Sequence, residues 1–318
     1  MNMRSITLRA LIVPCIVACV ACGDAEVSQP SGDSELFAGA SADAPGSDAD
    51  SPPRCPAKLQ KSPNGPDVAG VALGLPANEA LNIVRCHARD AVVLFEDRWF
   101  EPRSFNTHQT KLERQVFVAQ SGEHSPCDFS SYQAMQRCGP GQRSWDFVAE
   151  KIRVATPGLP GKQTVVGVWR TQNFPQGAMP SLDNVLLALK EKYGVHQFRG
   201  DKTVNNNLWS DRIELAWITD QAGTPLSEAN PLFNDCVRNV NGEVDAGQVW
   251  RDGCGLSIAA TVLTPRANPG VVGQLSVGLL DQSGLYRYQE AMQDALDQIE
   301  ETRRRAEVDE ARSGDVVL

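Results

Sequence analysis

The chain has 318 residues, of which 42% are hydrophobic and 22% are charged, and its formal net charge is −9 at pH 7. This length allows one large domain or two small ones with a sizeable core. The negative balance argues against nucleic acid as a partner, because that affinity comes mainly from cations that neutralise phosphates.

Residues 1–21 predict a lipoprotein signal peptide. Two arginines precede an apolar run over residues 10–21, which is too short to span a bilayer and has the length of a secretory signal. The sequences IVAC, ending at Cys19, and CVAC, ending at Cys22, both resemble the bacterial lipobox, in which small and aliphatic residues precede the lipidated cysteine. We expect lipidation at Cys22, where a polar linker begins, with Cys19 as the alternative. An ordinary signal peptide cleaved near Ala21 remains open.

Residues 22–53 predict an acidic, disordered tether. Residues 24–53 contain seven acidic side chains and no basic one, with too few large apolar residues to offset the entropy of ordering. As a flexible coil of thirty residues, this segment has an end-to-end distance of about 30 Å. Without the two arginines of the signal the formal charge is −11, of which −7 lies in the tether and −4 in the remaining body. No acidic residue directly follows either lipobox cysteine, so we expect attachment to the outer membrane, on its periplasmic or surface face.

The first run of elements, residues 54–178, begins with a strand, a turn and a helix. Residues 68–88 read VAGVALGLPANEALNIVRCHA, in which Val68, Val71 and Leu73 predict one short buried strand and Gly74 a break. Pro76 suits the first turn of the following helix, since its φ angle is already helical. Four strands are expected after this helix, at residues 91–95, 115–119, 147–154 and 165–169.

The second run, residues 179–281, partly repeats this order. Ser181 predicts a helix N-cap, and Gly194 in KYG predicts the helix end. Strands are expected at residues 213–218, 256–263 and 271–280, with a further strand beginning at residues 249–250. The apolar stripe of this helix is formed by Leu182, Val185, Leu186 and Leu189.

Turn-forming segments such as PGLPG, NG and NPG separate the strands in the manner of antiparallel connections. No regular alternation of strand and helix supports a doubly wound sheet. The predicted fold class is therefore α+β, with antiparallel strands and one helix in each of two pseudo-duplicated halves. The sequence leaves open whether the halves share one sheet.

Residues 282–318 predict a long C-terminal helix and a tail. Its charge pattern alternates past Ile299, so we expect the distal half to project into solvent or meet a polar partner. The proximal half carries an apolar stripe able to dock on the body, formed by Leu285, Tyr288, Met292, Leu296 and Ile299.

The Gly-Leu-Pro-x-x-Glu-Ala helix start at residues 74–80 resembles the Gly-Met-Thr helix start of small bacterial periplasmic lipoproteins of the outer-membrane assembly (SmpA/OmlA) family. Leu75 stands in place of Met and Pro76 in place of the capping Thr, and the resemblance covers about twenty residues, with a poorer echo at residues 179–189. It implies an extracytoplasmic α+β module that scaffolds other proteins.

Six cysteines follow the lipobox cysteine Cys22, an even number that favours disulfides in an exported chain. Sequence proximity favours Cys127 with Cys138 and Cys236 with Cys254, the latter across a hairpin-like loop, which leaves Cys55 with Cys86. Each short loop closed in this way contributes roughly 3 kcal/mol in the chain-entropy account. The alternative use of these cysteines is a zinc site built from Cys86, His87, His124 and Cys127.

The sequence provides no catalytic, cofactor-binding or metal-binding residue that we assign. Ser144 and Ser210 lie outside any GxSxG or SxxK motif. Charge clusters at residues 96–98 and at Asp211 with Glu214 are the remaining acid/base candidates, and a solvated strand edge is the strongly favoured interpretation of both. His108 and His196 are expected to be exposed loop residues. The six tryptophans suggest either a sugar-binding face or core packing, the second being favoured: Trp99, Trp145, Trp169, Trp209, Trp217 and Trp250.

Together these features predict a lipid-anchored exported protein of the cell envelope, acting as a non-catalytic binding or scaffold module with an envelope protein as partner. The alternative is a secreted or periplasmic hydrolase that acts on the cell wall or on nutrients through scattered carboxylates. If the protein is the lipid-anchored module, its N-terminal lipid attaches it to the membrane.

We predict that the mature chain begins at a lipidated Cys22, because the tether composition starts directly after it. Intact mass spectrometry of the protein from the membrane fraction measures this. An N-terminus at Val20 or later without acyl mass would contradict the prediction.

Overall fold

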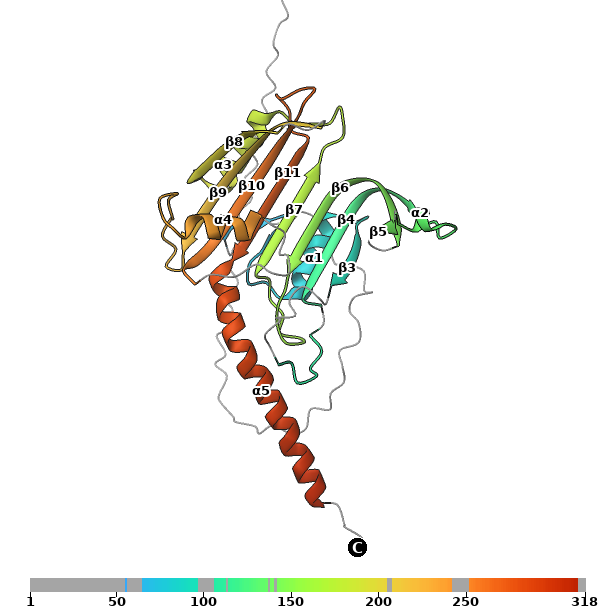
Figure 1. Ribbon diagram of the computed structural model, residues 1–318, viewed down its shortest axis with the longest axis vertical. Coiled ribbons are helices and arrows are strands. Elements are labelled where there is room, and N and C mark those ends of the chain that lie inside the picture. Colours follow the sequence, from blue (N-terminus) through green and yellow to red (C-terminus); the bar gives the residue numbers. More distant parts are fainter. Residues whose placement is uncertain are drawn as a thin grey trace, which may run out of the picture. The chain divides into compact units, whose positions relative to one another are not determined.

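The fold is α+β and is built on one large antiparallel sheet (Figure 1). The computed structural model describes Cys55 and residues 65–96, 106–112, 114–136, 138–139, 142–204, 208–241 and 252–313, all within the compact unit Pro52–Leu318. These residues confirm the predicted class and the antiparallel pairing. They also show that the two halves share a single sheet.

Nine strands of the described residues form this sheet. In spatial order they are β3 (Val92–Glu96), β4 (Val116–Pro126), β6 (Arg143–Ala155), β7 (Gly167–Asn173), β11 (Gln274–Asp281), β10 (Cys254–Pro265), β9 (Trp209–Asp220) and β8 (Phe198–Thr203), while β5 (Cys138–Gly139) pairs with β6.

The two halves have the same order of elements. Helix α1 (Ala77–His87) is followed by the meander β3-β4-β6-β7, and helix α3 (Leu182–Tyr193) is followed by the meander β8-β9-β10-β11. The last strands of the halves, β7 and β11, pair antiparallel and join the meanders. The centre of the sheet is therefore the junction of the two halves.

Both helices are attached to their halves by the same backbone contacts. The N-cap residue of α1, Pro76, bridges Thr164 in the β6–β7 connection, and the N-cap residue of α3, Ser181, bridges Val271 in the β10–β11 connection. In each case the first helical residue donates its N–H to the carbonyl that precedes the bridge, at 3.1 Å in α1 and 2.9 Å in α3. Matching contacts of this kind make the halves structural repeats.

The repeats are related by an approximate two-fold axis through the β7–β11 pair. Arg170 lies six residues after Thr164, and Val277 lies six residues after Val271, so the two residues are equivalent. They are also direct cross-strand partners. A pair that is both equivalent and directly opposed lies at the axis.

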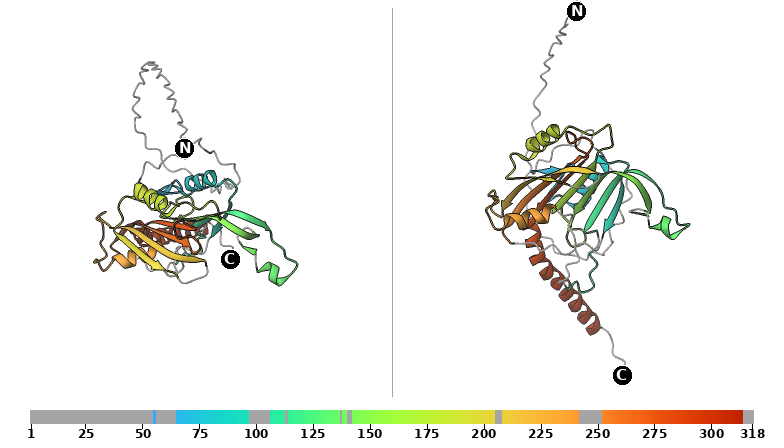
Figure 2. Two further views of the ribbon diagram at one scale, coloured as in Figure 1. Left: turned by 90° about the horizontal axis from the view of Figure 1, so that it is seen from above. Right: turned by 45° about the horizontal axis from the view of Figure 1, so that its top comes forward.

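Helices cover both faces of the sheet (Figure 2). One face carries α1, α3 and a small hairpin, β1 (Asp67–Val68) with β2 (Val71–Ala72), over a core that includes Phe117, Ile152 and Ile258. The other face carries α4 (Phe233–Asn241) and the first turns of α5 (Gln282–Ser313), where Trp169 donates its indole N–H to the Val240 carbonyl at 3.0 Å. A one-turn helix, α2 (Tyr132–Met135), lies between β4 and β5.

The predicted ends of α3 are confirmed. The Ser181 hydroxyl accepts a hydrogen bond from the Asn184 N–H at 3.3 Å. Gly194 ends the helix with a φ of 85°, a left-handed value that favours glycine. Val185 and Leu189 are buried, while Leu182 and Leu186 are partly buried against the same core.

The fold differs from the expected local structure in three places, and a fourth expectation is not tested. Residues 68–73 form a hairpin rather than one strand, because Ala69 and Gly70 both adopt positive φ and reverse the chain between β1 and β2. Cys236 lies on helix α4 rather than in a hairpin-like loop. Strand β8 was not predicted, since its sequence FRGDKT is polar and mostly exposed. The expected strand start at residues 249–250 lies outside the described residues.

The cysteines are joined as Cys55–Cys86, Cys127–Cys138 and Cys236–Cys254, with Cα–Cα distances of 5.3, 5.5 and 5.7 Å. These pairs are the ones expected from sequence proximity. Disulfides of this number indicate an oxidising, extracytoplasmic location.

Helix α5 divides into a packed and a solvated part. Leu285, Met292 and Leu296 are buried, and the last two pack with Leu112 and Leu159. Ile299 is 40% exposed, whereas every residue from 301 to 312 is exposed. In the distal turns, side chains three or four residues apart form ion pairs, such as that of Arg303 with Glu307.

We predict that ending the chain after Glu301 lowers the free energy of unfolding by less than about 1 kcal/mol, because the described side chains that are removed are exposed, although Glu300, itself 6% exposed, loses its partners Arg303 and Arg304. Met292→Asp should lower it by about 3 kcal/mol through burial of an unpaired charge. Thermal denaturation of both variants measures this, with Gln298→Asp on the exposed face of α5 as the matched control. Unfolding of the truncated chain would show that the distal turns are packed.

Candidate functional site

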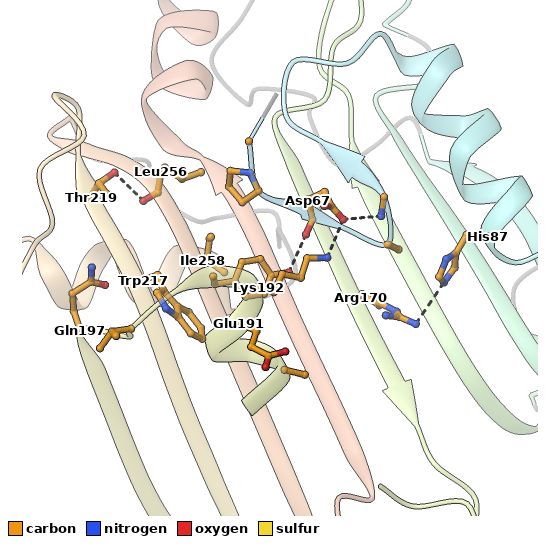
Figure 3. A pocket seen from close by; sticks show the side chains of 17 residues that line it. Asp67, His87, Arg170, Glu191, Lys192, Gln197, Trp217, Thr219, Leu256 and Ile258 are labelled. Atoms are coloured by element: carbon orange, nitrogen blue, oxygen red, sulfur yellow. Dashed lines mark hydrogen bonds and ion pairs between the residues drawn. The ribbon is translucent and has the colours of Figure 1, made fainter. Parts of the chain in front are cut away.

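A groove of about 840 Å³ lies at the junction of the two halves, on the face covered by α1 and α3 (Figure 3). Its floor comes from β7, β9 and β10, and its walls come from the β1–β2 hairpin, the end of α1 and the end of α3. The position follows from the repeat, because each helix is attached to its own half and the ends of the two helices leave a space between them. The side chains that carry functional groups are Asp67, His87, Arg170, Glu191, Lys192, Tyr193, Gln197, Trp217 and Thr219.

Arg170 anchors a polar cluster beside the axis. Its Nε donates to Glu150 Oε1 at 2.5 Å, and the same carboxylate oxygen lies 3.2 Å from His87 Nε2. Burial alone raises the pKa of Glu150, but the hydrogen bond with His87 and the charge of Arg170 outweigh it, so this pKa lies below its ordinary value. The carboxylate is only 13% exposed and stays ionised between its two partners.

A second ion pair ties the hairpin to α3. Lys192 Nζ lies 2.9 Å from Asp67 Oδ1, which also accepts the Gly70 N–H at 2.9 Å. The Tyr193 hydroxyl donates to the Asp67 carbonyl at 2.9 Å. Burial and the charge of Asp67 raise the pKa of Tyr193, so its hydroxyl stays protonated as a donor. Asp67 therefore serves the structure of the groove wall rather than a ligand.

An aromatic wall closes the groove on the side of β9. The ring of Trp217 lies 5.5 Å from that of Tyr193 and 6.2 Å from that of His196. Its indole N–H donates to the Gly194 carbonyl at 3.0 Å, directly after α3 ends. The arrangement combines apolar surface, fixed charges and hydrogen-bond donors in one concave site.

The structure separates the residues proposed for zinc. Cys86 and Cys127 belong to different disulfides. His87 joins the Glu150 cluster, and His124 packs edge-on against Trp145 at 4.9 Å. Among the described residues, no group of three or more histidine, cysteine, aspartate or glutamate side chains is placed to hold a metal ion.

The acid/base candidates Asp211 and Glu214 lie on β9, which is paired on both sides, and Glu214 is 8% exposed, so it is not the solvated strand-edge charge expected from the sequence. The Ser210 hydroxyl donates to its neighbour Asp211 at 2.7 Å, and Glu214 pairs with Lys202 and Arg212 at 2.8 Å each. The side chains at residues 96–98 lie outside the described part of the chain.

Two histidines expected in exposed loops make tertiary contacts instead. His108 Nε2 lies 2.7 Å from Asp297 Oδ1 and fixes the 106–112 segment to α5. His196 is half-buried against Trp217.

Two of the tryptophans are buried, as expected if these residues pack in the core. Trp169 and Trp217 are 5% and 6% exposed, yet Trp217 also lines the groove. Trp99 and Trp250 lie outside the described residues.

Sequence reasoning did not identify Asp67, Glu150, Arg170 or Lys192 as parts of a site. Arg170 and Glu150 follow apolar strand residues and resemble ordinary edge charges. One available signal was that both sit on the face that is otherwise apolar in their strands, since Val168 and Ile152 belong to the core on that side. A charge in such a register position needs a partner.

No family model, curated protein or solved structure matches this chain. Within the described residues, no helix is long and apolar enough to cross a membrane.

We predict that Glu150→Gln lowers the free energy of unfolding by about 1–3 kcal/mol at pH 7, because Arg170 loses its partner. The folded-state pKa of Glu150 lies below the unfolded value of about 4.3, so its contribution is complete above that pH and is lost as the pH falls through the folded value. Denaturant unfolding from pH 7 to pH 3 should therefore show the wild type and the variant converging. Glu191→Gln, at an exposed position of the groove, is the control and should change stability by less than about 0.5 kcal/mol. A difference that persists unchanged at pH 3 would contradict this account.

Proposed function

We propose that this protein is an extracytoplasmic binding module whose ligand site is the groove at the junction of its two halves. The observation that carries the proposal is the groove itself, which at about 840 Å³ lies within the range typical of ligand pockets. It also has the composition of such pockets, with an aromatic and aliphatic lining and a few fixed polar groups.

The groups in the groove are arranged for binding. Arg170 and Lys192 are each held by a carboxylate, so little side-chain entropy is lost when a ligand reaches them. Glu150 is kept ionised by two partners, whereas a general acid near neutral pH needs a raised pKa. These features favour recognition over proton transfer.

The proposal includes the location inferred from the N-terminal sequence. A lipid on Cys22 would attach the module to the outer membrane, and the three disulfides agree with an oxidising compartment. A module of this kind either captures a small molecule or presents it to an envelope partner.

A blocking variant tests the proposal. Ala188 lies at an exposed position on α3 and lines the groove, so Ala188→Trp should fill the groove without disturbing the core. Leu187→Trp is the matched control, because Leu187 is the neighbouring residue, is 54% exposed and does not line the groove.

We expect a panel of amino acids, sugars, organic acids and organic phosphates to contain ligands that raise the melting temperature of the wild type and of Leu187→Trp, but not of Ala188→Trp. A ligand at one hundred times its Kd contributes about 2.7 kcal/mol of stability. Ligands that stabilise Ala188→Trp equally, or a panel with no ligand at millimolar concentration, would contradict the proposal. New products in NMR spectra of a stabilising ligand would instead support the hydrolase alternative.

A further inference from the structure

A second void of about 210 Å³ adjoins the groove beneath α3. Its lining is mainly aliphatic and comes from the β1–β2 hairpin, α3, β11 and β7, the last of which contributes the polar residues Arg170 and Gln172. The apolar side chains are Val68, Ala69, Val185, Ala188, Leu189, Leu275 and Val277. We call this void the inner cavity.

The groove and the inner cavity share five residues, which define a neck between them: Ala69, Arg170, Ala188, Lys192 and Tyr193. Both charged side chains of the neck are cations. The carboxylate partner of Lys192, Asp67, lines the groove but not the inner cavity, and Glu150, the partner of Arg170, lines neither.

Hydrogen-bond donors remain at the neck after these ion pairs are counted. The contacts that the described residues make with Arg170 run through Nε and Nη2, so the two N–H donors of Nη1 remain for a ligand. Lys192 Nζ carries three donors, lies 5.5 Å from the centre of the Tyr193 ring and makes one hydrogen bond within the described residues, with Asp67 Oδ1. Arg170 is 26% exposed and Lys192 is 39% exposed, which keeps both within reach of the groove.

We propose that the neck and the inner cavity bind an amphiphilic anion, a carboxylate or phosphate monoester whose head contacts Arg170 and Lys192 and whose apolar body fills the inner cavity. This inference rests on the proposed function and names its ligand class. An engineered cavity of about 150 Å³ holds benzene, so the inner cavity accommodates a body of about six to eight carbons.

Charge and polarity at the neck disfavour the other ligand classes. A cationic head would face two like charges in a partly desolvated site, which weakens binding. A sugar would bury many hydroxyl groups against aliphatic side chains, and each buried hydroxyl without a partner is unfavourable.

The experiment measures binding of straight-chain carboxylates from acetate to decanoate to the full-length protein by calorimetry. Acetate should not bind measurably. Each added methylene should lower the Kd about fourfold until the inner cavity is full, near octanoate, and longer chains should gain nothing further. Octanol and octylammonium test the head group, and both should bind at least tenfold more weakly than octanoate.

Arg170→Gln should weaken octanoate binding about tenfold or more while leaving octanol binding unchanged, because a charge-assisted hydrogen bond is lost. Arg199→Gln, an exposed arginine on β8 outside both voids, is the matched control and should have no effect. If Arg170→Gln does not fold, Ala188→Trp at the neck still tests the site, since it should abolish octanoate binding and Leu187→Trp should not.

The source of the ligand is decided by competition. Displacement of octanoate by octyl phosphate alone indicates a soluble anion, and displacement by monomeric lysophosphatidic acid, which also carries a phosphate monoester, indicates a lipid; both outcomes support the proposal.

Failure of the inference is distinguishable from failure of the proposed function. Equal binding of octanol and octanoate, or binding that does not depend on chain length, overturns the anionic amphiphile. If other panel ligands are then still blocked by Ala188→Trp, the groove remains a binding site. If no ligand of either experiment is blocked by Ala188→Trp, both are wrong.

Discussion

The pairing of β7 with β11 is the interaction on which the rest of the structure depends. It joins two four-stranded meanders into one sheet and places the approximate two-fold axis between Arg170 and Val277. Each helix is fixed to its own half by backbone bonds at its first turn, and only the later turns of α3 reach over β7 and β11, where they line the inner cavity. The groove follows from this geometry, since the shared strands are roofed by the β1–β2 hairpin and by the ends of α1 and α3 rather than by a helix of their own.

The two repeats differ in sequence where they meet, so the groove is charged on one side of the axis and aliphatic on the other. Glu150 is opposite Gln172 in the first half, and Ile258 is opposite Leu279 at the equivalent place in the second half. An arginine with its glutamate therefore corresponds to a valine with an isoleucine. One side of the axis carries a charged cluster and the other carries aliphatic surface, a combination that suits ligands with both kinds of groups.

Each half also carries a disulfide in the connection between its second and third strands. Cys127–Cys138 lies between β4 and β6, and Cys236–Cys254 fixes α4 to the start of β10. The third disulfide holds Cys55 against the last turn of α1, next to His87. These bridges restrain the long connections on both sides of the sheet. The groove is further held by the bond of Asp67 to Lys192, which couples the hairpin to α3.

The sequence by itself determined the features that depend on near neighbours along the chain. The cap at Ser181, the end at Gly194, most strand positions, the change of α5 near Ile299 and the closest disulfide pairing all follow from local pattern and short loops. It could not show that residues 68–73 turn back as a hairpin, because the positive φ of Ala69 is imposed by its surroundings. It also could not show α4 or β8, whose polar sequences owe their structure to packing on neighbouring elements.

The site was decided by tertiary structure alone. Arg170 meets Glu150 across 20 residues, Glu150 meets His87 across 63, and Lys192 meets Asp67 across 125. Nothing local distinguishes these side chains from solvated charges, because the face on which a strand residue lies and the partner it meets depend on strand order and register. The strand order and register at the centre of the sheet are fixed only when β7 and β11 pair. Until then no groove exists, since its walls come from both halves of the chain and its floor lies between them.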